Sequence, residues 1–154
     1  MLDDALIHGS CIAIGGEGVL LLGPPGAGKS DLTLRLLDQP GCGLSGCSRA
    51  ARLVADDQVA IRHAGGVLTA SAPAALAGKL EVRGLGIVRL PATAEVPLVL
   101  AVRLTPTAEI ERLPELETSR MDILGLSLPL VLIDPEKASA AARIRAALDH
   151  FRAL

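Results

Sequence analysis

Residues 23–30 read GPPGAGKS, that is Gly23-Pro24-Pro25-Gly26-Ala27-Gly28-Lys29-Ser30. This octapeptide fits the pattern G-x-x-x-x-G-K-[S/T] at every specified position, and an apolar run at residues 19–22 precedes it. Over residues 29–37 the leucines fall near helical spacing, and Pro40-Gly41 follows. The stretch therefore predicts a strand, a phosphate-binding loop and a helix in direct succession.

The residue types in this loop suit a nucleoside triphosphate. Its glycines let backbone N–H groups converge on phosphate oxygens, and the helix N-terminus adds positive potential. We expect Lys29 to reach the β and γ phosphates and Ser30 to offer its hydroxyl to Mg²⁺. A chance match in a glycine-rich turn is the alternative, which the flanking strand and helix disfavour. The sequence contains no Asn-Lys-x-Asp run of the kind that reads guanine in GTPases of this loop class, so ATP is favoured over GTP.

A pair of aspartates, Asp56 and Asp57, follows the apolar residues 53–55. Acidic residues at the end of a strand are how the second acidic motif of such enzymes reaches the metal and the attacking group. Neighbouring carboxylates on an extended chain point to opposite faces, so we expect one to face the nucleotide and its metal and the other to orient a partner. Acidic turn residues at a solvated strand end remain the alternative.

The remaining pattern predicts an α/β fold with a mixed β-sheet. Gly15 to Gly18 and Gly65-Gly66 predict hairpin turns, and residues 39–50 have the composition of an exposed loop. A C-terminal helix is expected with Asp134 as its cap, Pro135 at its first position and an apolar stripe at its inner face. That stripe comprises Ala141, Ile144, Leu148 and Phe151. Further strands are expected at residues 11–14, 59–61, 67–70, 96–104 and 128–133.

Composition narrows the classes of function. A chain of 154 residues, half of them apolar, can fill one hydrophobic core, so we expect residues 1–154 to form a single domain. The net charge of −2 lacks the basic excess that nucleic acid binding needs. The apolar runs are too short to span a membrane and the N-terminus lacks a secretory pattern, which points to the cytoplasm. Three cysteines in a chain of this size are expected to be reduced thiols.

Four blocks in order resemble the catalytic domain of the HPr kinase/phosphorylase family. They are Ile7-His8-Gly9, the loop at residues 23–30, residues 53–57, and Glu81-Val82-Arg83-Gly84-Leu85-Gly86-Ile87-Val88, which is similar to the signature segment of that family. Weaker similarities at Glu111-Arg112-Leu113 and at residues 123–129 extend the resemblance from about residue 6 to about residue 133. The resemblance implies an ATP- and Mg²⁺-dependent protein kinase that phosphorylates a serine of the phosphocarrier protein HPr in the phosphotransferase system, and a homo-hexameric assembly.

The resemblance also implies roles for individual residues. Asp57 matches the aspartate that acts as base toward the serine hydroxyl, and Lys29 matches the phosphate-binding lysine. Ser30 and Glu81 match residues that hold the metal, and we add Asp56 to this set. His8 matches a histidine beside the active site, and Arg112 is a weaker match for a catalytic arginine.

Three departures from the family pattern bear on function. The chain starts almost at the His8 block, so we expect a catalytic domain without the N-terminal regulatory domain of longer members. The loop at residues 39–50 lengthens the path to the aspartates. After Ile133, where the family carries an arginine-containing segment tied to phosphate removal, the chain has Asp134-Pro135-Glu136-Lys137, which leaves at most a weak phosphorylase activity. A small-molecule kinase and a nucleotide-binding regulatory switch are the alternative functions.

Overall fold

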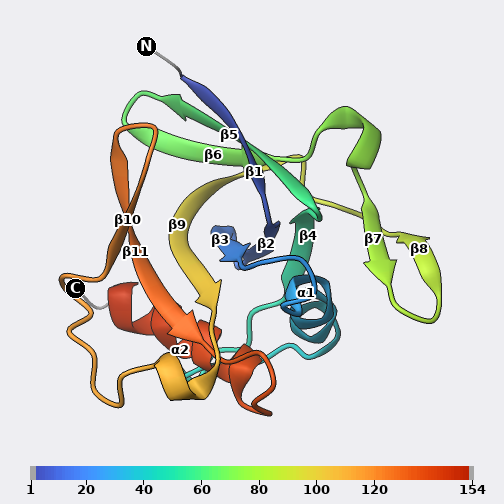
Figure 1. Ribbon diagram of the computed structural model, residues 1–154. Coiled ribbons are helices and arrows are strands. Elements are labelled where there is room, and N and C mark those ends of the chain that lie inside the picture. The colour runs from blue at the N-terminus through green and yellow to red at the C-terminus, as the bar shows by residue number, and fades with distance from the viewer. Residues whose placement is uncertain (1–2, 153–154) are drawn as a thin grey trace.

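The computed structural model describes residues 3–152, and the chain folds into two α-helices, two 3₁₀ turns and eleven strands (Figure 1). The elements in order are β1 (Asp4–His8), β2 (Ser10–Ile14), β3 (Glu17–Leu22), α1 (Lys29–Asp38), β4 (Ala51–Ala55), β5 (Gln58–Ala64), β6 (Val67–Ser71), η1 (Ala74–Leu76), β7 (Lys79–Val82), β8 (Gly86–Arg89), β9 (Glu95–Leu104), η2 (Thr107–Glu109), β10 (Arg120–Ile123), β11 (Leu126–Ile133) and α2 (Ala140–Arg152).

A curled nine-stranded mixed sheet forms the body of the molecule. Its strand order is β1-β5-β6-β9-β3-β2-β4, with β11 also paired to β9 and β10 paired to β11. The long strand β9 pairs antiparallel with β6 near its start and parallel with both β3 and β11 further along. Strand β4 runs antiparallel to β2, which is itself antiparallel to β3, so β3, β4, β9 and β11 all point in the same direction.

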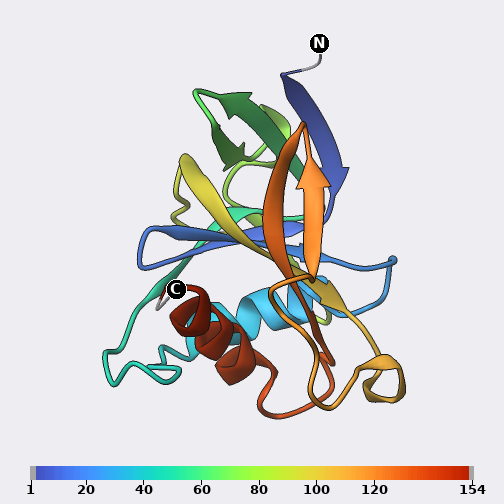
Figure 2. The same cartoon turned by 90° about the vertical axis from the view of Figure 1, so that its left-hand side faces the viewer.

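The core divides into two clusters on the two faces of the central strands. Helices α1 and α2 lie together on one side of the sheet (Figure 2) and bury an apolar cluster that includes Leu32, Leu36 and Ile144. The other cluster fills the inside of the curled sheet and includes Leu20, Val54 and Ile61. Burial of these side chains, at about 25 cal/mol for each Å² of apolar area, stabilises the frame that holds the loops at the strand ends.

The predicted α/β class with a mixed sheet is confirmed, and so are both glycine hairpins, at β2–β3 and β5–β6. The predicted start of the C-terminal helix is wrong. Asp134 accepts a hydrogen bond from the Glu136 N–H at 2.9 Å and so caps a short turn, while α2 itself begins at Ala140. Three of the predicted stripe positions of α2, Ala141, Ile144 and Leu148, are buried, while Phe151 is only partly buried. Ala140 and Arg145 are buried members that were not predicted.

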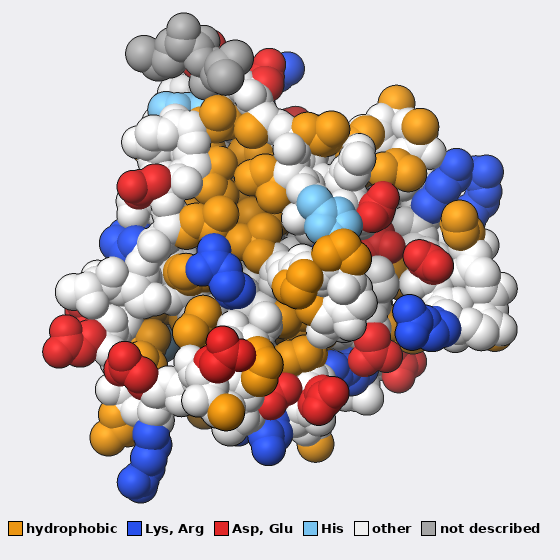
Figure 3. Space-filling model, viewed as in Figure 1, with side chains coloured by type: hydrophobic (Ala, Val, Ile, Leu, Met, Phe, Trp, Pro, Cys, Tyr) orange, Lys and Arg blue, Asp and Glu red, His pale blue; other side chains and the backbone are white. Residues whose placement is uncertain are grey.

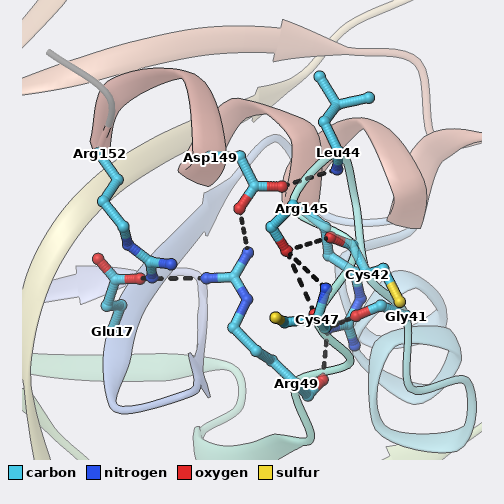
Figure 4. Close-up of polar contacts among 10 residues, drawn as sticks. Glu17, Gly41, Cys42, Leu44, Cys47, Arg49, Arg145, Asp149 and Arg152 are labelled. Atoms are coloured by element: carbon cyan, nitrogen blue, oxygen red, sulfur yellow. Dashed lines mark hydrogen bonds and ion pairs between the residues drawn. The ribbon is translucent and has the colours of Figure 1, made fainter.

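Arg145 fastens the loop at residues 39–50 to the helices (Figure 4). Its guanidinium donates to four carbonyl oxygens, those of Leu36, Gln39, Gly41 and Arg49, at 2.6 to 3.3 Å. Arg49 in turn pairs with Asp149 at 2.8 Å and with Glu17 at 3.2 Å, and Arg152 also contacts Glu17. The loop is exposed as predicted, but its base is closed by a buried charge on α2.

Across the residues that the structure describes, no helix is both long enough and apolar enough to cross a bilayer. The three cysteines, Cys11, Cys42 and Cys47, are free thiols, as expected.

Candidate functional site

The carboxyl ends of the parallel strands meet at one edge of the sheet, and a cleft of about 890 Å³ opens there. Ligands in open α/β sheets bind outside the carboxyl ends of the strands, in clefts of roughly 300–1,000 Å³. The lining combines the glycine loop (residues 23–30), the aspartates after β4, the β7–β8 hairpin and the segment after β11. On the face shown in Figure 3, acidic side chains and a histidine gather toward the β7–β8 side, with basic side chains at that edge.

The glycine loop joins β3 to α1 as predicted, and α1 begins at Lys29. Gly26 and Gly28 have φ values of 82° and 104°, which only glycine adopts without strain. Lys29 is buried, and its Nζ donates to the carbonyl oxygens of Gly23 and Pro24 at 2.7 and 2.9 Å. Burial lowers the pKa of Lys29, while the carboxylates of Asp56 and Asp57 act in the opposite direction. The ammonium group is thus fixed at the mouth of the loop.

Asp56 is the buried carboxylate of the site. It accepts hydrogen bonds from the hydroxyl of Ser10 at 2.8 Å and from that of Ser30 at 2.9 Å. The backbone N–H of Glu81 donates to the same carboxylate at 3.4 Å. These contacts join β2, α1 and β7 at one group, so Asp56 sets the position of the Ser30 hydroxyl.

Asp57 lies in an unusual backbone conformation. Its φ is 72°, and the Gln58 N–H donates to the Asp56 carbonyl oxygen at 2.9 Å across it, so the chain reverses within three residues. The Gly9 N–H donates to the Asp57 carbonyl oxygen at 3.1 Å and holds this turn against β1–β2. The expectation that the two aspartates face opposite ways on an extended chain is therefore wrong, and both carboxylates line the same cleft.

The His8 imidazole lies beside Asp57, with its Nδ1 3.6 Å from the carboxylate. Both side chains are about half exposed or more, at 47% and 66%, so an incoming group can reach them from solvent. An exposed carboxylate with a neighbouring imidazole can orient and accept a proton from a hydroxyl. The structure thus brings together His8, Lys29, Ser30, Asp56 and Asp57 in one cleft, as the sequence predicted.

The β7–β8 hairpin supplies one wall of the cleft through Glu81, Val82 and Arg83. The signature segment at residues 81–88 forms this hairpin, and Gly84 and Gly86 have positive φ values at its turn. Arg112, by contrast, is exposed on the segment between η2 and β10 and does not line the cleft. Its catalytic role therefore stays a prediction, and Arg83 is the arginine that the structure places at the β7–β8 wall.

The opposite wall comes from the segment after β11, which the family resemblance linked to phosphate removal but whose residues were not among the predicted site residues. Pro135 and Glu136 line the cleft together with Asp31 and Arg35 of α1. Asp134 accepts hydrogen bonds from the Thr107 hydroxyl at 2.5 Å and from the Glu136 N–H, which lower the pKa of its carboxyl. Asp31 directly follows the motif and Arg35 lies one helical turn after it, so the i, i+4 spacing of these two residues was the available signal for them.

Comparison with known proteins identifies the family. Residues 1–152 match the model of the HPr serine kinase C-terminal domain. The chain belongs to this family. An HPr kinase/phosphorylase from Burkholderia lata is 40% identical over 139 residues, which are 84% of the chain and 40% of that protein. One from Clostridium acetobutylicum is 42% identical over 96 residues, which are 59% of the chain and 28% of that protein.

A solved structure supports the fold of this family member. The HPr(Ser) kinase/phosphatase from Coxiella burnetii superposes with a TM-score of 0.77 at 22% sequence identity, covering 97% of each chain. The chain spans less than half the length of the Burkholderia and Clostridium relatives. The family and its fold are thus established for residues that include every part of the cleft.

Proposed function

We propose that the protein is an ATP-dependent kinase that phosphorylates a serine of the phosphocarrier protein HPr. The observation that carries this proposal is the meeting, in one cleft, of a buried lysine in a glycine loop with an exposed aspartate and histidine. The lysine and its glycine loop suit the phosphates of a nucleotide. The aspartate and the histidine suit a hydroxyl group that enters the cleft from solvent. The names of the curated relatives support HPr as the protein that carries this hydroxyl.

The proposed reaction is an in-line phosphoryl transfer. The serine oxygen forms a bond to the γ-phosphorus of ATP, the bond from that phosphorus to the bridging oxygen of ADP breaks, and the serine proton passes to the Asp57 carboxylate. Lys29 offsets charge on the phosphates and the loop N–H groups fix their position. His8, 3.6 Å from Asp57, keeps the carboxylate oriented. Most of the rate acceleration then comes from positioning and electrostatics.

Mg²⁺ fits the residues at this site. Mg²⁺ is held in such enzymes by one or two carboxylates, a hydroxyl, substrate phosphates and water. Ser30 and Asp56, 2.9 Å apart, provide the hydroxyl and a carboxylate, and Glu81 adds a second carboxylate in the cleft lining. Residues 3–152 hold no cluster of three or more His, Cys, Asp or Glu side chains arranged for a metal. When bound, the ion would neutralise charge on the phosphate oxygens.

Glu81→Gln tests the metal assignment. Loss of one carboxylate charge should raise the Mg²⁺ concentration needed for half-maximal rate about 3- to 10-fold, while the rate at saturating Mg²⁺ stays within a few-fold. Mg²⁺ titrations of the initial rate measure this effect. Glu109→Gln, an exposed glutamate outside the cleft lining, is the control. An unchanged titration in the Glu81 variant would remove Glu81 from the metal site.

The substrate is tested by incubating the purified protein with labelled ATP and Mg²⁺ and with either HPr or a panel of small hydroxyl-bearing metabolites. We expect label on one serine of HPr and none above background on the metabolites. Label on a metabolite alone would favour a small-molecule kinase. ATP binding without any transfer would favour a regulatory switch.

The same preparation tests the direction of the reaction. Supplied with serine-phosphorylated HPr and millimolar inorganic phosphate but no ATP, it should release HPr and pyrophosphate much more slowly than it phosphorylates HPr. The reason is that residues 134–137 carry Asp134 and Glu136 where the family resemblance implies an arginine-containing segment, so the arginines linked to phosphate removal are replaced by carboxylates. Comparable rates in the two directions would contradict this expectation.

A further inference from the structure

The strand order places two segments on opposite sides of the glycine loop. In the sheet, β3 lies between β2–β4 on one side and β9–β11 on the other. The aspartates follow β4 and the segment at residues 134–137 follows β11, and both strands are parallel to β3. Along the edge of the sheet the order is therefore Asp56 and Asp57, then the glycine loop, then Pro135 and Glu136, and all of them line one cleft.

This order gives a bound nucleotide its direction. On the proposed function, the transferred phosphoryl group lies at the end where Asp57 and His8 meet the incoming hydroxyl. The rest of the nucleotide must then extend the other way, past Gly28 and the start of α1. Pro135 borders this path closely, because a Cβ added at Gly28 would lie 3.5 Å from the Pro135 Cβ. Glu136, which follows Pro135, therefore lies beyond the phosphate-binding loop, where the sugar of the nucleotide would be.

The segment that carries Glu136 is held from both sides. Arg35 of α1 donates to the carbonyl oxygens of Pro135 and Lys137 and pairs with Asp31 at 3.2 Å. Asp134 binds Thr107 and the backbone N–H of Glu136 itself, so its charge is already hydrogen-bonded within the segment. Within residues 3–152 the Glu136 carboxylate makes no hydrogen bond or ion pair, although its neighbours on both sides are fixed and it lines the cleft.

A carboxylate at this position selects one part of the nucleotide. An ionised carboxylate accepts hydrogen bonds only, so it repels phosphate and binds hydroxyl groups. We propose that Glu136 binds the ribose hydroxyls of the nucleotide, with Arg35 and Asp134 as the residues that position it. The inference rests on the proposed function, because it requires that the glycine loop binds a nucleotide.

The test measures equilibrium binding by calorimetry with Mg²⁺, using ADP, 2′,3′-dideoxy-ADP and inorganic pyrophosphate as ligands. In the wild-type protein ADP should bind about 10-fold more tightly than its dideoxy analogue, since hydrogen bonds to a charged group are lost. Glu136→Ala should weaken ADP about 10-fold and leave the affinities for dideoxy-ADP and pyrophosphate unchanged or higher. Glu136→Gln, which keeps one acceptor oxygen, should recover part of the preference for ADP.

Glu117→Ala, at an exposed glutamate outside the cleft lining, is the control and should bind all three ligands as the wild type does. Equal affinity of the wild-type protein for ADP and dideoxy-ADP would overturn the ribose assignment. An equal loss for all three ligands in the Glu136 variant would also overturn it, because the residue would then act on the fold or the phosphates. Failure of the wild-type protein to bind any of the three ligands would instead overturn the proposed function on which the inference rests.

Discussion

Replacing Lys29 with alanine should reduce phosphoryl transfer by at least about 10³-fold and weaken ATP binding, because the cation on the β and γ phosphates is lost. Lys29 is 7% exposed, and its ammonium is held between two loop carbonyl oxygens, so it is already placed for anionic oxygens. Initial rates with HPr and calorimetric titration with ATP measure the two effects separately.

The control for this substitution is Lys79→Ala. Lys79 donates to the Ala75 carbonyl oxygen at 3.0 Å on the surface and does not line the cleft, so its replacement should change the rate less than two-fold. Circular dichroism and thermal unfolding of both variants separate a folding defect from a loss of function. Wild-type turnover in a folded Lys29→Ala variant would show that the glycine loop is not the phosphate site.

Asp57→Asn should lower the transfer rate by about 10² or more while ATP affinity and the fold stay largely intact. An amide cannot accept the serine proton, but asparagine tolerates the φ of 72° that the turn at this position requires. Alanine would add backbone strain and confuse the two effects. Single-turnover rates with saturating ATP and HPr measure the chemical step.

Two companion substitutions make the result specific to Asp57. Asp122→Asn, at an exposed position of β10 outside the cleft lining, should leave the rate unchanged. Asp56→Asn should act mainly on the metal requirement, since Asp56 is buried against the Ser30 hydroxyl. If Asp56→Asn lowered the single-turnover rate at saturating Mg²⁺ more than Asp57→Asn did, the roles of the two aspartates would be reversed.

Much of the fold could be predicted because its central strands and helices are strongly patterned. Strands β3, β4 and β9 are apolar runs, and the spacing of the buried residues in α1 and α2 is helical. Strands β7, β8 and β10 are four residues long and bury only Leu80 and Ile123 among them, so hydrophobic periodicity carries little signal for these strands. The start of α2 was misplaced because Asp134-Pro135 is an equally good opening for a turn.

The candidate site also has residues that could be predicted from the sequence and residues that could not. Lys29, Ser30, Asp56 and Asp57 lie within or directly after strongly patterned elements, and the structure brings them together. The wall formed by Pro135 and Glu136 depends on β9 and β11 running parallel to β3. This arrangement requires β3 to pair with β9 about 80 residues further along the chain, and β9 to pair with β11 about 30 residues further still. Long-range pairing of this kind leaves no local mark in a single sequence. The conformation of Asp57 also escaped prediction, because it is set by the Gly9 contact from β1–β2.

The Arg145 guanidinium has a consequence for how the chain tolerates changes in length. Its four carbonyl partners include the end of α1 and both ends of the loop at Gly41 and Arg49, and Asp149 also binds the Leu44 N–H at 2.7 Å. Only the tip at residues 45–48 is left outside these contacts. Loop-closure entropy rises by only about 0.6 kcal/mol when a loop doubles in length. Insertions at the tip would therefore cost little stability, whereas a deletion that removed Gly41 or Arg49 would leave a buried cation short of acceptors.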